Sequence, residues 1–91
     1  MSARPGESLR EQLDRLSALA DQGNAEAAFR VAREYMLDQY GIQDLDRAAL
    51  YYRMSIDHTV ATDMRNTLSR QHLARICATG RLRAESNRHC L

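Results

Sequence analysis

The sequence predicts an all-α protein of four antiparallel helices, arranged as stacked helical hairpins. Apolar residues recur at intervals of three and four through most of the 91 residues, which is the spacing of one helix face. Gly23, Gly41 and Gly80 fall between these apolar runs, where helix ends are expected. The apolar residues are mostly Ala and Leu, which suit close helix packing better than the core of a β-sheet. A chain of this length forms a single domain with a thin core.

The first two helices are expected at about residues 8–22 and 25–40. Residues 1–6 contain little that can pack and are expected to form a flexible leader. Gly23 ends the first helix, and Asn24 is a suitable N-cap for the second because its side chain accepts from free amides of the first turn. One face of the first helix is apolar and is formed by Leu9, Leu13, Leu16 and Ala20.

The third helix is expected at about residues 44–57, with Asp44 as its cap, and the fourth at about 61–79. The fourth is irregular because Ala61, Met64 and Leu68 lie on one side, whereas a second apolar group lies on the other. Either the helix kinks near residues 69–71, or the second group contacts another chain. We favour the second alternative, which predicts an oligomer interface formed by Leu73, Ile76 and Cys77. Residues 81–91 are expected to be a polar, basic tail.

The central segment, residues 23–56, resembles a Sel-one-like repeat, a relative of the tetratricopeptide repeat with a longer loop. The residues at the positions of that pattern in the first helix of the unit are Ala25, Ala27, Val31, Ala32 and Tyr35. Those in its second helix are Asp44, Ala48, Tyr51, Tyr52, Ser55 and Ile56. The chain departs from the pattern with Val for Leu, Tyr for Trp, Ser-Ile for Ala-Ala and a corner that is one residue shorter. Weaker copies of the two halves flank the unit, for example LARIC at 73–77 beside VAREY at 31–35.

The resemblance implies a helical scaffold or adaptor that binds a protein or peptide, and it implies no catalysis. Solenoids need about three repeats to bury a continuous core. This chain offers one good unit and two partial ones, so a homo-oligomer, most simply a homodimer, is expected to cover the exposed ends.

Tyrosines concentrate around the central hairpin, and Tyr with Arg dominates the energetic centres of protein interfaces. The alternative is that Tyr35 and Tyr52 are core residues. The sequence therefore predicts a partner-binding patch formed by Tyr40, Tyr51, Arg33, Arg47 and Arg53.

Composition argues against several other functions. The net charge is +1 with both signs interspersed, so no strong field favours nucleic acid or anionic lipid. All thirteen basic residues are Arg, which with abundant Ala favours a GC-rich, bacterial genome. The alternative function is a small regulator that contacts nucleic acid through Arg81, Arg83 and Arg88.

No nucleophile motif, phosphate-binding Gly loop or metal-ligand spacing is present, so no enzyme activity, cofactor or metal is expected. The residues considered and rejected as metal ligands are His58, His72, His89, Cys77 and Cys90. The absence of a signal-like or membrane-spanning apolar run favours the cytoplasm. There, Cys77 and Cys90 would both remain thiols.

Overall fold

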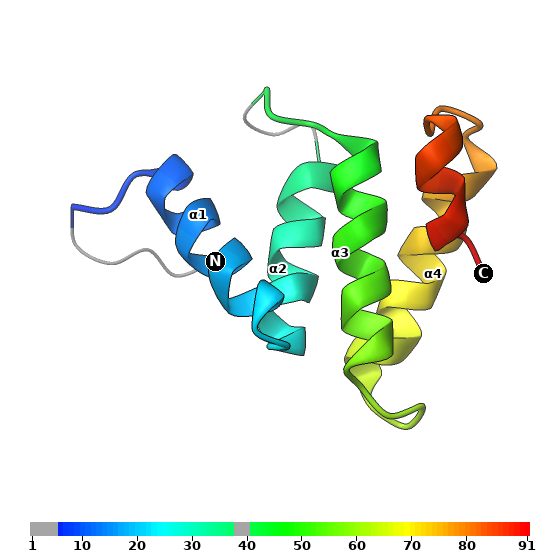
Figure 1. Cartoon of the computed structure of the whole chain (residues 1–91), viewed down its shortest axis with the longest axis horizontal. Helices are drawn as coiled ribbons and strands as arrows, with labels where there is room; N and C mark the ends of the chain where they lie inside the picture. The colour runs from blue at the N-terminus through cyan, green and yellow to red at the C-terminus, as the bar shows by residue number, and fades with distance from the viewer. Residues whose placement is uncertain (1–5, 38–40) are drawn as a thin grey trace.

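The computed structural model describes residues 6–37 and 41–91, and within these ranges the chain is helical with no strand. The elements are α1 (Leu9–Asp21), α2 (Ala25–Met36), α3 (Leu45–Asp57), α4 (Met64–Ala78) and a short 3₁₀ helix, η1 (Ala84–His89) (Figure 1). Successive helices pack on one another, which confirms the predicted all-α arrangement of helical hairpins.

Each α-helix begins at a short polar side chain that accepts a hydrogen bond from an amide of the first turn. The pairs, cap first, are Ser8 with Glu11, Asn24 with Ala27, Asp44 with Arg47, and Asp63 with Arg65. The caps at Asn24 and Asp44 are those predicted from the sequence. Asp63 also explains why α4 begins at Met64 and not near residue 61.

Gly23 ends α1 as predicted. Its φ of 94° lies in the left-handed region that favours glycine, and the Asn24 amide donates to the carbonyl of Leu19 at 3.1 Å. This closes α1 and turns the chain directly into the cap of α2. At the other end of α2, Leu37 is extended, so the helix ends at Met36 and is shorter than the predicted span to residue 40.

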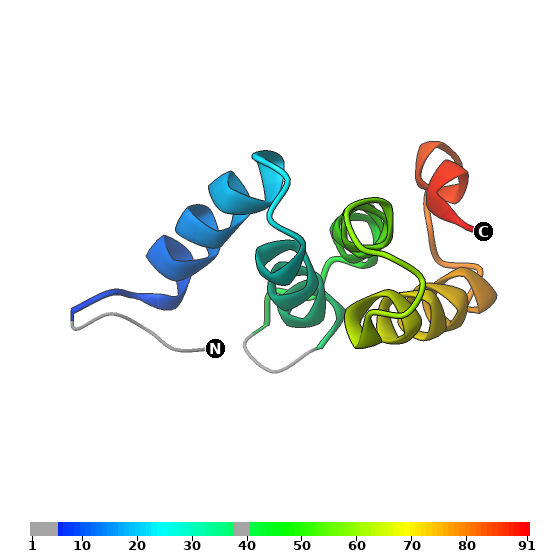
Figure 2. The ribbon, with the colours of Figure 1, turned by 90° about the horizontal axis from the view of Figure 1, so that it is seen from below.

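The helices form two layers when the molecule is viewed from below (Figure 2). In this view α2 and α4 lie in one layer, while α1 and α3 lie in the other, and η1 returns to the side of α3. Two core clusters fill the seams: one joins α1 to α2 around Leu16 and Val31, and the other joins α2, α3 and α4 around Tyr52 and Leu73.

The buried face of α4 differs from both predicted faces. It is one stripe, formed by Asn66, Ser69, Leu73 and Ile76, and its N-terminal half is polar. Met64 is 74% exposed, whereas Leu73 and Ile76 are 1% and 2% exposed. The predicted oligomer interface is therefore wrong for Leu73 and Ile76, because the chain itself buries these residues in its larger core cluster. The search for apolar periodicity missed the stripe because half of its members are polar.

The C-terminal residues are folded, which corrects three predictions. Cys77 and Cys90 form a disulfide across 13 positions, with Cα atoms 6.1 Å apart, so neither is a thiol and Cys77 is not free for an oligomer interface. Residues 84–89 form η1, which packs on α3 and is not an unstructured tail. Two cysteines in a chain predicted to be cytoplasmic gave no reason to pair them, and a 3₁₀ turn has too few residues to show a period.

Candidate interaction groove

A groove of about 680 Å³ lies between α1 and the start of α3. We call it the N-terminal groove. It lies where α1 packs on α2 beside the first turn of α3. The residues that line it are Ser8, Leu9, Arg10, Leu13, Tyr35, Gly41, Ile42, Gln43, Asp44 and Arg47.

One wall of the groove is apolar. Leu9 and Leu13 come from the first two turns of α1, and Ile42 comes from the connection that precedes α3. The cap at Ser8 fixes where α1 begins: its hydroxyl oxygen accepts from the Glu11 amide at 3.1 Å. The wall therefore combines a helix face with a loop side chain, a surface on which an apolar side chain of a partner can pack.

The opposite wall is an aromatic and cationic cluster. Arg47 donates from Nη1 to the Tyr35 hydroxyl at 3.2 Å, and its Cζ lies 5.6 Å from the centre of the Tyr35 ring. Tyr35 in turn stacks on Tyr51, with ring centres 6.3 Å apart and an angle of 17° between the planes. The hydrogen bond that Arg47 donates to Tyr35 is the main cause that raises the pKa of Arg47.

Asp44 holds this wall in place through its backbone and its side chain. Its amide donates to the Tyr35 carbonyl at 2.8 Å, which ties the start of α3 to the last turn of α2. Its carboxylate caps α3 and lies 3.6 Å from Nε of Arg47. Gln43 adds a bond from Nε2 to the Met36 carbonyl at 3.0 Å. The positions of Tyr35 and Arg47 are thus set before any partner arrives.

The structure divides the predicted partner-binding patch. Tyr51 and Arg47 come together through Tyr35, as described above. Arg33 is exposed on α2, where its charge acts on His72 of α4, and Arg53 pairs with Asp57 at 3.2 Å. These two arginines lie away from the groove. Tyr40 falls outside the described residues.

Sequence reasoning missed four groove residues: Leu9, Leu13, Tyr35 and Ile42. Leu9, Leu13 and Tyr35 were assigned to core positions, which is correct for Leu13 at 4% exposure. A usable signal was nevertheless present, since the segment before Gly23 has the residues of only one helix and therefore forms half of a repeat unit.

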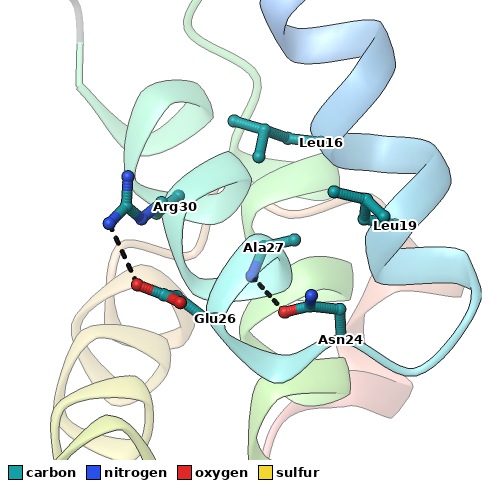
Figure 3. Close-up of a pocket in the computed structure, with 6 residues that line it drawn as sticks. All are labelled: Leu16, Leu19, Asn24, Glu26, Ala27 and Arg30. Carbon is teal, nitrogen blue, oxygen red and sulfur yellow. Dashed lines mark hydrogen bonds and ion pairs between the residues drawn. The ribbon is translucent and has the colours of Figure 1, made fainter. Parts of the chain in front are cut away.

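A second, smaller hollow of about 220 Å³ lies at the other end of the α1–α2 seam (Figure 3). Leu16 and Leu19 of α1 approach Ala27 there, and Asn24 caps α2 through a 3.0 Å bond to the Ala27 amide. Its rim carries one cation and one acid, Arg30 and Glu26, which pair at 2.9 Å. The wider N-terminal groove, in which Arg10 and Arg47 face a single acid, Asp44, is the better candidate site.

Among the residues that the structure describes, no cluster of three or more His, Cys, Asp or Glu is placed to hold a metal ion. Within residues 6–37 and 41–91, no helix is both long and apolar enough to cross a bilayer. No protein-family model, curated protein or solved structure matches the chain.

Proposed function

We propose that this protein is a non-catalytic interaction module that binds a peptide segment of a partner protein in the N-terminal groove. The observation that carries the proposal is the pairing of an apolar wall with a fixed Tyr35–Arg47 cluster in the same groove. Aromatic and Arg side chains of this kind supply most of the binding energy in protein interfaces. The resemblance of residues 23–56 to a Sel-one-like repeat supports the same role.

The chemistry of the groove favours a segment that carries a carboxylate beside an apolar side chain. Arg10 is exposed and lies 3.9 Å from Asp14, in a pair whose side chains are both more than 70% exposed. Such exposed pairs are weak, so Arg10 is available to an acid of the partner. Arg47 supplies a second cation, and Leu9 and Ile42 supply the apolar contact.

Selection from a displayed peptide library against the full chain tests this proposal. We expect enriched peptides to combine an acidic residue with a neighbouring apolar residue, and their affinity to fall about tenfold or more in Arg47→Glu. Arg33→Glu and Arg53→Glu are matched controls, because they make the same charge change outside the groove. Equal losses in all three variants would show only a general charge effect and would refute binding in the groove.

Self-association is also part of the proposal, since a short stack has open ends. The interface expected on α4 is no longer available, whereas Val60 and Met64, at 70% and 74% exposure, leave apolar surface near the α3–α4 turn. Light scattering of the wild type and of a Val60→Ser/Met64→Ser variant checks this point. A wild-type protein that is strictly monomeric at high concentration would refute the proposed self-association.

A cytoplasmic location and a bacterial source are proposed on composition alone. The alternative, binding of nucleic acid by Arg81, Arg83 and Arg88, has less support, because Arg83 pairs with Asp46. In a reducing cytoplasm the Cys77–Cys90 disulfide would be transient, since stable disulfides are rare there.

A further inference from the structure

The C-terminal segment, residues 81–91, folds back along α3 after Gly80. We call it the C-terminal clasp. Gly80 has a φ of 67°, a left-handed conformation that turns the chain out of α4. η1 then packs on α3, and the disulfide between Cys90 and Cys77 ties the end of the clasp to the last turn of α4 (Figure 1). The clasp therefore covers one edge of the α3–α4 pair.

A single side chain of α3, Asp46, receives the polar contacts of the clasp. The Arg83 amide donates to Oδ1 of Asp46 at 2.9 Å, and Nε of Arg83 lies 3.6 Å from Oδ2. The Ser86 hydroxyl also hydrogen-bonds the carboxylate, and this is the main cause that lowers the pKa of Asp46. Asp46 is thus the non-covalent anchor of the clasp.

This non-covalent anchoring is weak. The Arg83 side chain is 72% exposed, and exposed ion pairs contribute little. η1 has six residues, lacks a side-chain cap and buries only Ser86. A 3₁₀ helix this short is not stable by itself. Leu82 packs against the larger core cluster but is only partly buried. The covalent bond is consequently the strongest restraint on the clasp.

We propose that the Cys77–Cys90 disulfide is a redox-controlled latch, whose reduction releases the clasp from α3 and uncovers the α3–α4 edge of the stack. The reductant is a protein dithiol of the thioredoxin class. One of its thiolates attacks a cystine sulfur to give a mixed disulfide, and its second thiol displaces the cysteine. The reductant is oxidised to its disulfide, and two electrons and two protons end on the Sγ atoms of Cys77 and Cys90.

Cys77 and Cys90 are both only partly buried. A disulfide is reduced faster where an attacking thiolate can reach it, so this bond is open to a reductant. The uncovered edge includes the part of the larger core cluster on which Leu82 packs.

Hydrogen exchange of the full chain, oxidised and after reduction by a dithiol, tests the latch. The amides of Ser86 and Cys90, which donate to the carbonyls of Arg83 and Asn87, report the clasp. We expect them to exchange at least about tenfold faster after reduction, while amides of α2 and α3 keep their protection. Trypsin should then cleave after Arg81 and Arg83 faster by a similar factor.

A Cys77→Ser/Cys90→Ser variant should show the fast rates with and without reductant, and Asp46→Asn should accelerate exchange only modestly while the disulfide is intact. The latch is overturned if the reduced clasp stays protected, because Asp46 then suffices to hold it. It is equally overturned if reduction unfolds the whole chain, which would make the disulfide a structural staple. If the double variant fails to fold, hydrogen exchange of the wild-type protein at increasing dithiol concentrations gives the same test.

Discussion

The α2–α3 and α3–α4 interfaces differ in the polarity of the side chains that form them. Between α2 and α3 the contact is dry: Ala32, Ala48 and Tyr52 are all 0% exposed and belong to one apolar cluster. Between α3 and α4 the N-terminal half of the contact is polar. The Ser69 hydroxyl donates to the Ser55 hydroxyl at 3.0 Å, and both residues are fully buried.

The polar half of the α3–α4 interface also supports the turn between the helices. Asn66 donates from Nδ2 to the Ile56 carbonyl at 3.3 Å and to the Thr59 hydroxyl at 3.2 Å. Thr59 donates onward to the Ser55 carbonyl at 2.6 Å. These bonds satisfy the end of α3, where carbonyls lack helical partners. Small apolar residues therefore set how closely α2 and α3 approach, whereas directional hydrogen bonds set the register of α4 on α3.

The largest expected effect comes from breaking the dry interface at Tyr52. Its ring lies 6.0 Å from that of Phe29 and 5.4 Å from that of His72, and burial raises the pKa of its hydroxyl. Tyr52→Ala removes this contact and leaves a cavity, so we expect a loss of about 3–5 kcal/mol in the free energy of unfolding. Urea denaturation followed by circular dichroism measures it.

Two further variants at this interface serve as controls. Tyr52→Phe keeps the ring and removes only a 3.6 Å contact from the hydroxyl to the Met36 sulfur, so it should cost less than about 1 kcal/mol. Tyr51→Ala, on the half-buried side of the same helix, should cost less than Tyr52→Ala. Equal losses at residues 51 and 52 would contradict the assignment of Tyr52 to the centre of the core.

The central hairpin was predictable because its signals are local. Asn24 and Asp44 cap the helices as expected, and the alanines at 32 and 48 follow the apolar period that buries them. The groove was predictable in part: Arg47 was predicted as a binding residue, whereas Leu9 and Ile42 line the same groove only through the packing of separate elements.

The buried face of α4 and the contacts of the C-terminal clasp could not be predicted. The first is partly polar, and the second join residues that are far apart in the sequence. Asn66 and Ser69 occupy core positions that an apolar count excludes. Arg83 reaches Asp46 across 37 positions, and Cys90 reaches Cys77 only after η1 has folded back on α3. Such pairings depend on where α3 and α4 place the chain, and no short sequence pattern records them.

A smaller effect is expected from the polar interface at Asn66, which is 3% exposed. Asn66→Asp keeps the size of the side chain but replaces its donors with a carboxylate that faces the carbonyls of Ile56 and Thr59. We expect a loss of about 1–3 kcal/mol in the free energy of unfolding, the usual cost of an unsatisfied buried group. Thermal denaturation of the two proteins side by side measures it.

Thr67→Asp is the matched control for Asn66→Asp, because it introduces the same charge one residue later on the exposed side of α4. Its effect should stay within about 0.5 kcal/mol. If the two variants are equally stable, the hydrogen bonds of Asn66 do not hold α4 in register, and the contrast between the two interfaces fails.

The smallest effect concerns pH and involves the residue that links the two interfaces. His72 of α4 stacks on Tyr52, and burial, followed by the charges of Arg75 and Arg33, lowers its pKa below the usual 6.5. The unfolded chain therefore binds a proton before the folded chain does as pH falls through about 6.5. Since the proton favours the unfolded state, stability should decrease from pH 7.5 to 5.5.

His89, whose pKa is lowered mainly by burial, contributes with the same sign. His72→Phe keeps an aromatic ring and removes the titrating group, so the decrease in melting temperature over this range should shrink but not vanish. The double variant His72→Phe/His89→Gln should make this decrease smaller still. An unchanged pH dependence in the double variant would show that neither histidine is held neutral by the fold.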